Sequence, residues 1–199
     1  MDDLINRSPL ADPLARLREL APSIAAAGDT IERTRRIPEP LLSELHDARL
    51  FRMLLPRSVG GDEIDPVAYV RAVELASSYD GSIGWCLSIA NSIALIAPYL
   101  DIAIAREIFG PPRSTCAWGP PNDFTAKAVP GGYRVTGQWS FASGCRHSSW
   151  MGAHGNVVEP DGSLRLNRFG RPTIRTWLFP TEQATLIDTW DTIVCCGKA

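Results

Sequence analysis

The chain has 199 residues, of which 45% are hydrophobic and 21% charged, and its formal net charge is -2. This apolar fraction and small net charge exclude a mostly disordered chain, and the length is sufficient for a sizeable hydrophobic core. The 20 basic residues are outnumbered by 22 acidic ones, so the chain has no general attraction to phosphate backbones. We therefore expect a folded protein without a nucleic-acid partner.

The longest apolar stretch, residues 83–100, is interrupted by Trp85, Ser88 and Asn91. A bilayer span needs about 20 predominantly apolar residues, so this stretch predicts a buried helix and no membrane association. The N-terminus lacks the basic start and apolar run of a secretory signal. Five cysteines without a CxxC pair suit free thiols in a reducing compartment. These features predict a cytoplasmic protein.

Between Pro13 and Phe109 the apolar residues recur every three or four positions, which predicts a series of helices. Gly28 offers a stop for the first of them, with the next N-cap at Asp29 or Thr30. The third helix is expected to bury its apolar residues, Val67, Val70, Val73 and Leu75. The expected helices cover approximately residues 14–27, 41–51, 66–78, 83–97 and 101–109.

After Gly110-Pro111-Pro112 the pattern changes to β-branched and aromatic residues that alternate with polar ones. The expected strands are Ser114–Trp118, Thr125–Val129, Tyr133–Ala142, Ser149–Val158, Ile174–Pro180 and Leu186–Trp190. The chain is therefore predicted to be an α+β protein. An all-α domain over residues 1–112 precedes an antiparallel, barrel-like or sandwich-like β-domain over residues 113–199.

The three histidines, His46, His147 and His154, show no HxxxH or HExxH spacing, so we expect no metal site. His46 lies beside Glu44 and Asp47 and is expected at the solvated surface. The sequence has no GxSxG elbow or P-loop, and no GxGxxG follows a strand. Their absence removes the common hydrolase, nucleoside-triphosphate and Rossmann interpretations.

One segment, residues 132–144, combines a strand pattern with aromatic residues, small residues and hydroxyls. The simplest interpretation is a β-hairpin whose aromatic residues fill the core. That interpretation explains less well why Trp118, Trp139, Phe141 and Trp150 occur together with several serines. Flat apolar walls with a few hydroxyl and backbone donors suit a planar heterocycle such as a flavin, so both interpretations remain open.

Three motifs give the sequence a family resemblance. They are Leu50-Phe-Arg-Met-Leu-Leu-Pro-Arg-Ser-Val-Gly-Gly61, Ala76-Ser-Ser-Tyr-Asp-Gly-Ser-Ile-Gly-Trp85, and Gly132-Tyr-Arg-Val-Thr-Gly-Gln-Trp-Ser-Phe-Ala-Ser-Gly144. With them the chain resembles the acyl-CoA dehydrogenase superfamily over nearly its whole length. The third motif is the most specific, and it resembles the two-component flavin-dependent monooxygenases more than the dehydrogenases.

The resemblance implies a helical domain, a β-domain and a C-terminal four-helix bundle, with a reduced flavin, FMN or FAD, between the last two. It implies cofactor-binding roles for Trp118, Gly119, Phe141 and Ser143. Ser143 is also the candidate catalytic residue, because its hydroxyl would lie beside the reactive edge of the ring. Trp85 and Asn91 would face the substrate.

Three features depart from the family pattern. Residues 116–123 lack the Thr-Glu-Pro turn of the dehydrogenases. After Trp190-Asp-Thr, residues 193–199 lack the family's glycine, arginine and Gly-Thr-Gly-Ser run, and the sequence ends where the C-terminal bundle would follow. We therefore expect a truncated chain whose β-domain is incomplete at its C-terminal end.

The favoured interpretation is a monooxygenase that hydroxylates an aromatic or heteroatom substrate with O2. Its implied partners are a small aromatic or heterocyclic substrate, a separate flavin reductase and further copies of the chain in a homo-oligomer, a tetramer in the family. The alternatives are an acyl-CoA dehydrogenase-like oxidation and a non-catalytic remnant or interaction module.

Overall fold

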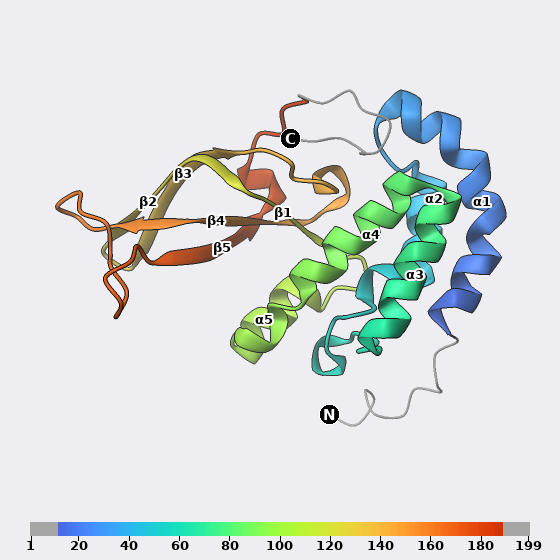
Figure 1. The fold of residues 1–199 in the computed structure, drawn as a ribbon, viewed down its shortest axis with the longest axis horizontal. Helices are drawn as coiled ribbons and strands as arrows, with labels where there is room; N and C mark the ends of the chain where they lie inside the picture. The colour runs from blue at the N-terminus through green and yellow to red at the C-terminus, as the bar shows by residue number, and fades with distance from the viewer. Residues whose placement is uncertain (1–11, 189–199) are drawn as a thin grey trace.

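The computed structural model describes residues 12–188, and for residues 121–123 it describes the backbone alone. The helices gather on one side of the molecule and the strands on the other, with α4 between α3 and the strands (Figure 1). This arrangement confirms the predicted α+β class. The helices are α1 (Pro13–Thr34), α2 (Glu39–Asp47), α3 (Pro66–Tyr79), α4 (Gly81–Ala94) and α5 (Ile102–Phe109).

Helix α1 continues through Gly28, so the predicted stop there is wrong. Its buried stripe of Ile24, Ala27 and Ile31 keeps helical spacing across the glycine. A side chain at Gly28 would meet nothing within 4 Å, so the glycine occupies an ordinary, partly exposed helical position. The helix instead ends where Arg35 adopts a left-handed φ of 55°.

The predicted helix over residues 41–51 is divided in two. Helix α2 ends at Asp47, and a 3-10 turn covers Leu50–Arg52. The break falls at Arg49, which has a left-handed φ of 58°. The Arg49 side chain bonds Asp62 and the Gly60 carbonyl oxygen, so a long-range contact holds this conformation.

Helix α3 begins as expected, because the Asp65 carboxylate accepts hydrogen bonds from two backbone N–H groups of its first turn. Its buried face is different from the predicted one, since Val67 and Val70 are 58% and 60% exposed. Ala72 and Ala76 are buried instead. The small residues face inward because α4 approaches closely, and a Cβ on Gly84 would lie 2.0 Å from the Ser77 hydroxyl oxygen.

Helix α4 is the predicted buried helix, shifted by a few residues, and it begins with an N-cap bond of 3.0 Å from Ile83 N–H to Asp80. By length and composition alone, Gly81–Tyr99 could cross a membrane, but 56% of it is buried inside the structure. A core helix passes the same test. Nine residues of α4 are buried, and its main neighbours are α3, β1 and the 3-10 turn Leu50–Arg52.

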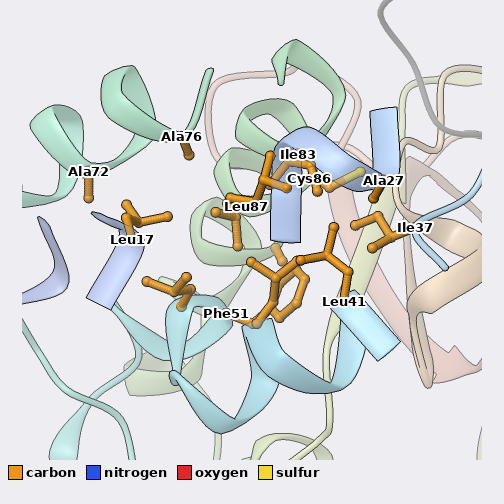
Figure 2. Close-up of a cluster of buried hydrophobic side chains, with 14 of the residues drawn as sticks. Leu17, Ala27, Ile37, Leu41, Phe51, Ala72, Ala76, Ile83, Cys86 and Leu87 are labelled. Carbon is orange, nitrogen blue, oxygen red and sulfur yellow. The ribbon is translucent and has the colours of Figure 1, made fainter. Parts of the chain in front are cut away.

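The helices enclose a continuous apolar core (Figure 2). Leu17 of α1, Leu41 of α2 and Leu87 of α4 point into it from three sides, and Phe51 fills the space between them. Burial of several large side chains supplies most of the favourable free energy of folding in such a cluster.

The strands are β1 (Cys116–Gly119), β2 (Pro121–Val129), β3 (Gly132–Trp139), β4 (Trp150–Val158) and β5 (Ile174–Pro180). Their order is β1-β4-β2-β3, with β5 on the other edge of β4. The predicted antiparallel sheet is corrected to a mixed one, because β4 runs parallel to both β1 and β2. The chain leaves β1 into the antiparallel β2–β3 hairpin before it returns as β4, so β1 and β4 point the same way.

Every predicted strand except Ile174–Pro180 differs from the observed structure at one end or both. Strand β3 stops at Trp139 and not at Ala142, because Phe141 takes a left-handed φ of 60°. Residues 186–188 of the predicted Leu186–Trp190 strand are not in a strand, and residues 189 and 190 lie outside the described residues.

A second apolar cluster joins the helices to the sheet. It contains Ile93 and Ala94 of α4, Ile108 and Phe109 of α5, and Cys116 of β1. Trp118, Trp150 and Leu178 pack against it from the strands. The helices and the sheet therefore share a core.

Candidate functional site

The predicted site residues Ser143 and Trp85 are in direct contact. The Trp85 indole Nε1–H donates a hydrogen bond of 2.9 Å to the Ser143 Oγ. Trp85 comes from α4 and is 45% exposed, whereas Ser143 follows β3 and is only 2% exposed. The bond joins residues 58 positions apart and holds the loop after β3 against the helix.

The loop of residues 140–144 turns sharply because two of its residues have left-handed backbones, Phe141 at φ 60° and Gly144 at φ 81°. The Ser143 N–H donates to the Phe141 carbonyl oxygen at 2.8 Å and tightens the turn. As a result, Phe141 is turned outward and 45% exposed, while Ser143 is turned inward. The loop thus presents an aromatic ring and a hydroxyl within three residues.

Gly119 at the end of β1 lies directly beside this loop. A Cβ at Gly119 would lie 2.5 Å from the Ser140 carbonyl oxygen and 3.3 Å from the Ala142 backbone nitrogen. The neighbouring Trp118 is half-buried and meets the His154 ring edge-on, with centroids 5.0 Å apart. The structure therefore brings Gly119, Phe141, Ser143 and Trp85 to one place, with Trp118 at its border.

Replacing Gly119 with alanine is expected to displace the loop, because the added methyl group would collide with backbone atoms that cannot rotate away. Such overpacking costs about 1–3 kcal/mol of unfolding free energy. Urea unfolding measures it. Gly132→Ala is the matched control, since a Cβ there meets nothing within 4 Å. Equal losses in the two variants would contradict the close approach.

Asn91 does not join this group. It is fully buried, its Nδ2 donates to the carbonyl oxygens of Leu50 and Leu87 at 2.9 Å each, and its Oδ1 accepts from the Leu54 N–H at 3.1 Å. These bonds fasten α4 to the segment after α2. The predicted role of Asn91 in orienting substrate stays a prediction, and the observed contacts give it a structural task.

His147 connects the two halves of the chain in a way that the sequence did not indicate. Its Nε2 accepts a hydrogen bond of 2.9 Å from the backbone N–H of Ile37, 110 residues away. Burial, with Arg36, Arg146 and His46 nearby, lowers the pKa of His147 to about 4. His147 and Ser143 also line one small cavity of about 10 Å³, at the lower limit for one water molecule.

His46 is not the solvated residue that its acidic neighbours predicted. It is 8% exposed and its ring packs on Phe51, with centroids 4.7 Å apart. Burial lowers the pKa of His46. The sequence signal that could have identified its position is the spacing from Leu42 and Leu45, which place His46 near the apolar stripe of α2.

The lowered pKa of His147 predicts a loss of stability in acid. Because the unfolded histidine binds a proton more readily than the folded one, its contribution is complete above about pH 6.5 and falls as the pH drops toward 4. The expected slope from this residue is at most about 1.4 kcal/mol per pH unit. Urea unfolding between these pH values measures it.

His147→Gln is the matched variant, since its amide oxygen could still accept from Ile37 but does not titrate. It should lower the slope of the unfolding free energy against pH by up to about 1.4 kcal/mol per pH unit, which corresponds to one proton. His46 and His154, whose pKa values burial also lowers, stay in place and keep part of the slope. An unchanged slope in His147→Gln would show that His147 is not the responsible group.

A larger cavity of about 750 Å³ is lined by residues of β3, β4 and β5 and of the segment after β5. Tyr133 and Trp139 of β3 meet Trp177 and Phe179 of β5 across it, with ring centroids 5.8 Å and 6.2 Å apart. None of its described lining residues is charged. The cavity is large enough for an organic ligand but offers a phosphate group no cationic partner.

Potential metal ligands are scattered in the described part of the chain. Within residues 12–188, no three His, Cys, Asp or Glu side chains come together as a metal site. Three cysteines, Cys86, Cys116 and Cys145, are buried. Burial raises the pKa of Cys116 to about 12, so this thiol stays protonated and unreactive at neutral pH.

Comparison with known proteins gives one consistent family. Residues 16–103 match the family described as acyl-CoA dehydrogenase, N-terminal domain. The oxygenase subunit HsaA of a flavin-dependent monooxygenase from Rhodococcus jostii (strain RHA1) is 29% identical over 184 residues, which are 90% of this chain and 45% of the relative. The indole-3-acetate monooxygenase of Pseudomonas putida is 30% identical over 169 residues, 83% of this chain and 41% of the relative.

Solved structures agree with these matches. XiaF from Streptomyces sp., in complex with FADH2 and glycerol, has a TM-score of 0.84 and 27% sequence identity over 94% of this chain and 46% of that chain. The HsaA monooxygenase from M. tuberculosis has a TM-score of 0.82 and 28% identity over 96% of this chain and 49% of that chain. The chain thus spans about half the length of the relatives it matches.

Proposed function

Because this chain belongs to the acyl-CoA dehydrogenase superfamily, we propose that it serves a flavin-dependent monooxygenase that oxidises a small aromatic or heterocyclic substrate with O2. The observation that carries this proposal is the group of Gly119, Phe141, Ser143 and Trp85, which comes from three separate segments. The relatives named as a flavin-dependent monooxygenase, an indole-3-acetate monooxygenase and an FADH2-dependent resorcinol hydroxylase support the reaction class.

The residues present fit a flavin ring. Phe141 offers an exposed aromatic face, Gly119 permits close backbone approach, and Ser143 supplies a hydroxyl beside them. A bound reduced flavin would supply the electrons that activate O2. Phe141 and Trp118 would wall the ring, and Ser143 would donate a hydrogen bond at its reactive edge. Trp85, half exposed on α4, would border the substrate.

We further propose the organisation that this role requires. Residues 1–112 form the helical domain and contribute the substrate side, and residues 113–199 form the β-domain and contribute the flavin side. A separate reductase supplies reduced FMN or FAD, further copies of the chain complete a homo-oligomer, and the reaction takes place in the cytoplasm. The relatives that are named oxygenase subunits or components support the separate reductase.

Anaerobic titration of the purified chain with reduced FMN and reduced FAD tests the proposal. Binding should change the flavin absorbance, and in a parallel titration with oxidised FMN, whose N5 accepts a hydrogen bond, Ser143→Ala should weaken binding by a factor of about 2 to 10. Ser163→Ala, which removes an exposed hydroxyl from a distant turn, is the matched control. Absence of binding at concentrations on the order of tens of micromolar would contradict flavin use by this chain alone.

A further inference from the structure

The hydrogen bond between Trp85 and Ser143 has only one possible direction. A tryptophan indole carries an N–H donor and no acceptor, whereas a serine hydroxyl can donate one hydrogen bond and accept two. The 2.9 Å contact must therefore use the Trp85 proton, with the Ser143 oxygen as acceptor. Trp85 cannot take up the proton of the hydroxyl.

That proton is left for another group. Among the described residues, the contact with Trp85 is the hydrogen bond in which the Ser143 hydroxyl takes part, and no protein acceptor for its proton is found there. The Ser143 side chain is nevertheless almost fully buried. A buried hydroxyl gains from an acceptor, because an unsatisfied buried donor costs roughly 1–3 kcal/mol. The arrangement therefore favours a ligand atom that accepts.

We propose that Trp85 is a positioning residue, which fixes the Ser143 hydroxyl as the hydrogen-bond donor of the flavin site. This inference rests on the proposed function and assigns Trp85 a task beyond bordering the substrate. Without the indole, the hydroxyl could rotate and present either its proton or a lone pair to the ligand. With the indole in place, one lone pair is occupied and the proton is directed elsewhere.

Helix α4 makes Trp85 suitable for this task. Its neighbours Gly84 and Cys86 are buried, and Ile83 and Leu87 are completely inaccessible. Gly84 also packs tightly on Ser77 of α3. The backbone beneath Trp85 is therefore immobilised on both sides, although the indole itself is half exposed. Sites on packed helices hold their side chains more accurately than sites on loops.

The geometry is tested first without flavin. The indole N–H signals of the protein's six tryptophans can be recorded by 15N NMR, and Trp85→Phe identifies the Trp85 signal by its loss. Ser143→Ala should shift this signal and speed its hydrogen exchange severalfold, while Ser143→Thr, which keeps a hydroxyl, should restore it. Trp177→Phe is the matched control and should leave the Trp85 signal in place. A signal that ignores Ser143→Ala would overturn the proposal.

The donor role is tested second, with oxidised and reduced FMN as probes. The N5 atom of oxidised flavin accepts a hydrogen bond, whereas N5 of reduced flavin carries a proton. Both Ser143→Ala and Trp85→Phe should therefore weaken the binding of oxidised FMN by about 2-fold to 10-fold and the binding of reduced FMN by less. A merely structural role would change both affinities equally, and this result would overturn the proposal.

The two arms also separate the proposal from the proposed function. If the wild-type chain binds neither form of FMN, flavin use by this chain alone fails. The indole measurement still decides whether Trp85 holds the Ser143 hydroxyl, because it needs no ligand.

Discussion

Replacing Asp62 with asparagine is expected to lower the free energy of unfolding by about 3 kcal/mol or more. The Asp62 side chain is 2% exposed and pairs with two arginines, Arg16 at 3.0 Å and Arg49 at 2.6 Å. Asparagine has nearly the same shape but no charge. The variant therefore leaves two guanidinium groups close together with no anion between them, and burial makes this costly.

Urea unfolding at neutral pH measures the loss. Asp47→Asn is the matched control, because Asp47 pairs with Arg113 at the same distance of 3.0 Å but with side chains 72% and 55% exposed. An exposed pair of this kind contributes only about 0–1 kcal/mol. Similar losses in the two variants would mean that burial of the Asp62 cluster does not determine its contribution.

Replacing Arg52 with methionine is expected to lower the free energy of unfolding by about 4 kcal/mol. Arg52 is 3% exposed and donates to four backbone carbonyl oxygens. They belong to Val59, Gly60, Phe109 and Pro111, at 2.9, 3.2, 2.7 and 3.0 Å. Methionine fills similar space but donates nothing, so all four carbonyl oxygens lose this donor. Gly60 still accepts from Arg49, and Pro111 still accepts from the Ser114 N–H.

The same unfolding experiment, with Arg106→Met as control, tests this expectation. Arg106 is an exposed arginine on α5, and its replacement should change stability by less than about 0.5 kcal/mol. The loss of stability in Arg52→Lys should lie between the losses in Arg52→Met and Arg106→Met, because an ammonium group keeps the charge but lacks the planar fork of donors. A loss in Arg52→Met no greater than that in Arg106→Met would refute the role of the four carbonyl contacts.

Local chemistry made much of the helical part predictable. The Asp65-Pro66 pair marks the start of α3, and Asp101 caps α5 with a bond of 2.8 Å to the N–H of Ala103. What could not be predicted depends on distant partners. The buried face of α3 is chosen by α4, and the break at Arg49 is held by Asp62.

In the sheet and the site, too, local features were predictable and contacts between distant segments were not. Strand Ile174–Pro180 was predicted at its observed bounds, but the parallel pairing of β1 with β4 joins residues 34 positions apart and leaves no local signal. The motif predicted Phe141 and Ser143 as site residues, and those roles stay predictions. The bond from Trp85 to Ser143 arises only when α4 packs against the loop.

The apolar cluster shared by the helices and the sheet has a mechanical consequence. Helix α4 touches the β part of the chain at two levels, through Trp85 at Ser143 and, eight residues later, through Ile93, whose Cδ1 would lie 3.4 Å from a Cβ at Gly152 of β4. The helix is therefore attached to the β part of the chain at two points, the loop that contains Ser143 and strand β4. A displacement of α4 would therefore change its contacts with the Ser143 loop and with β4 together.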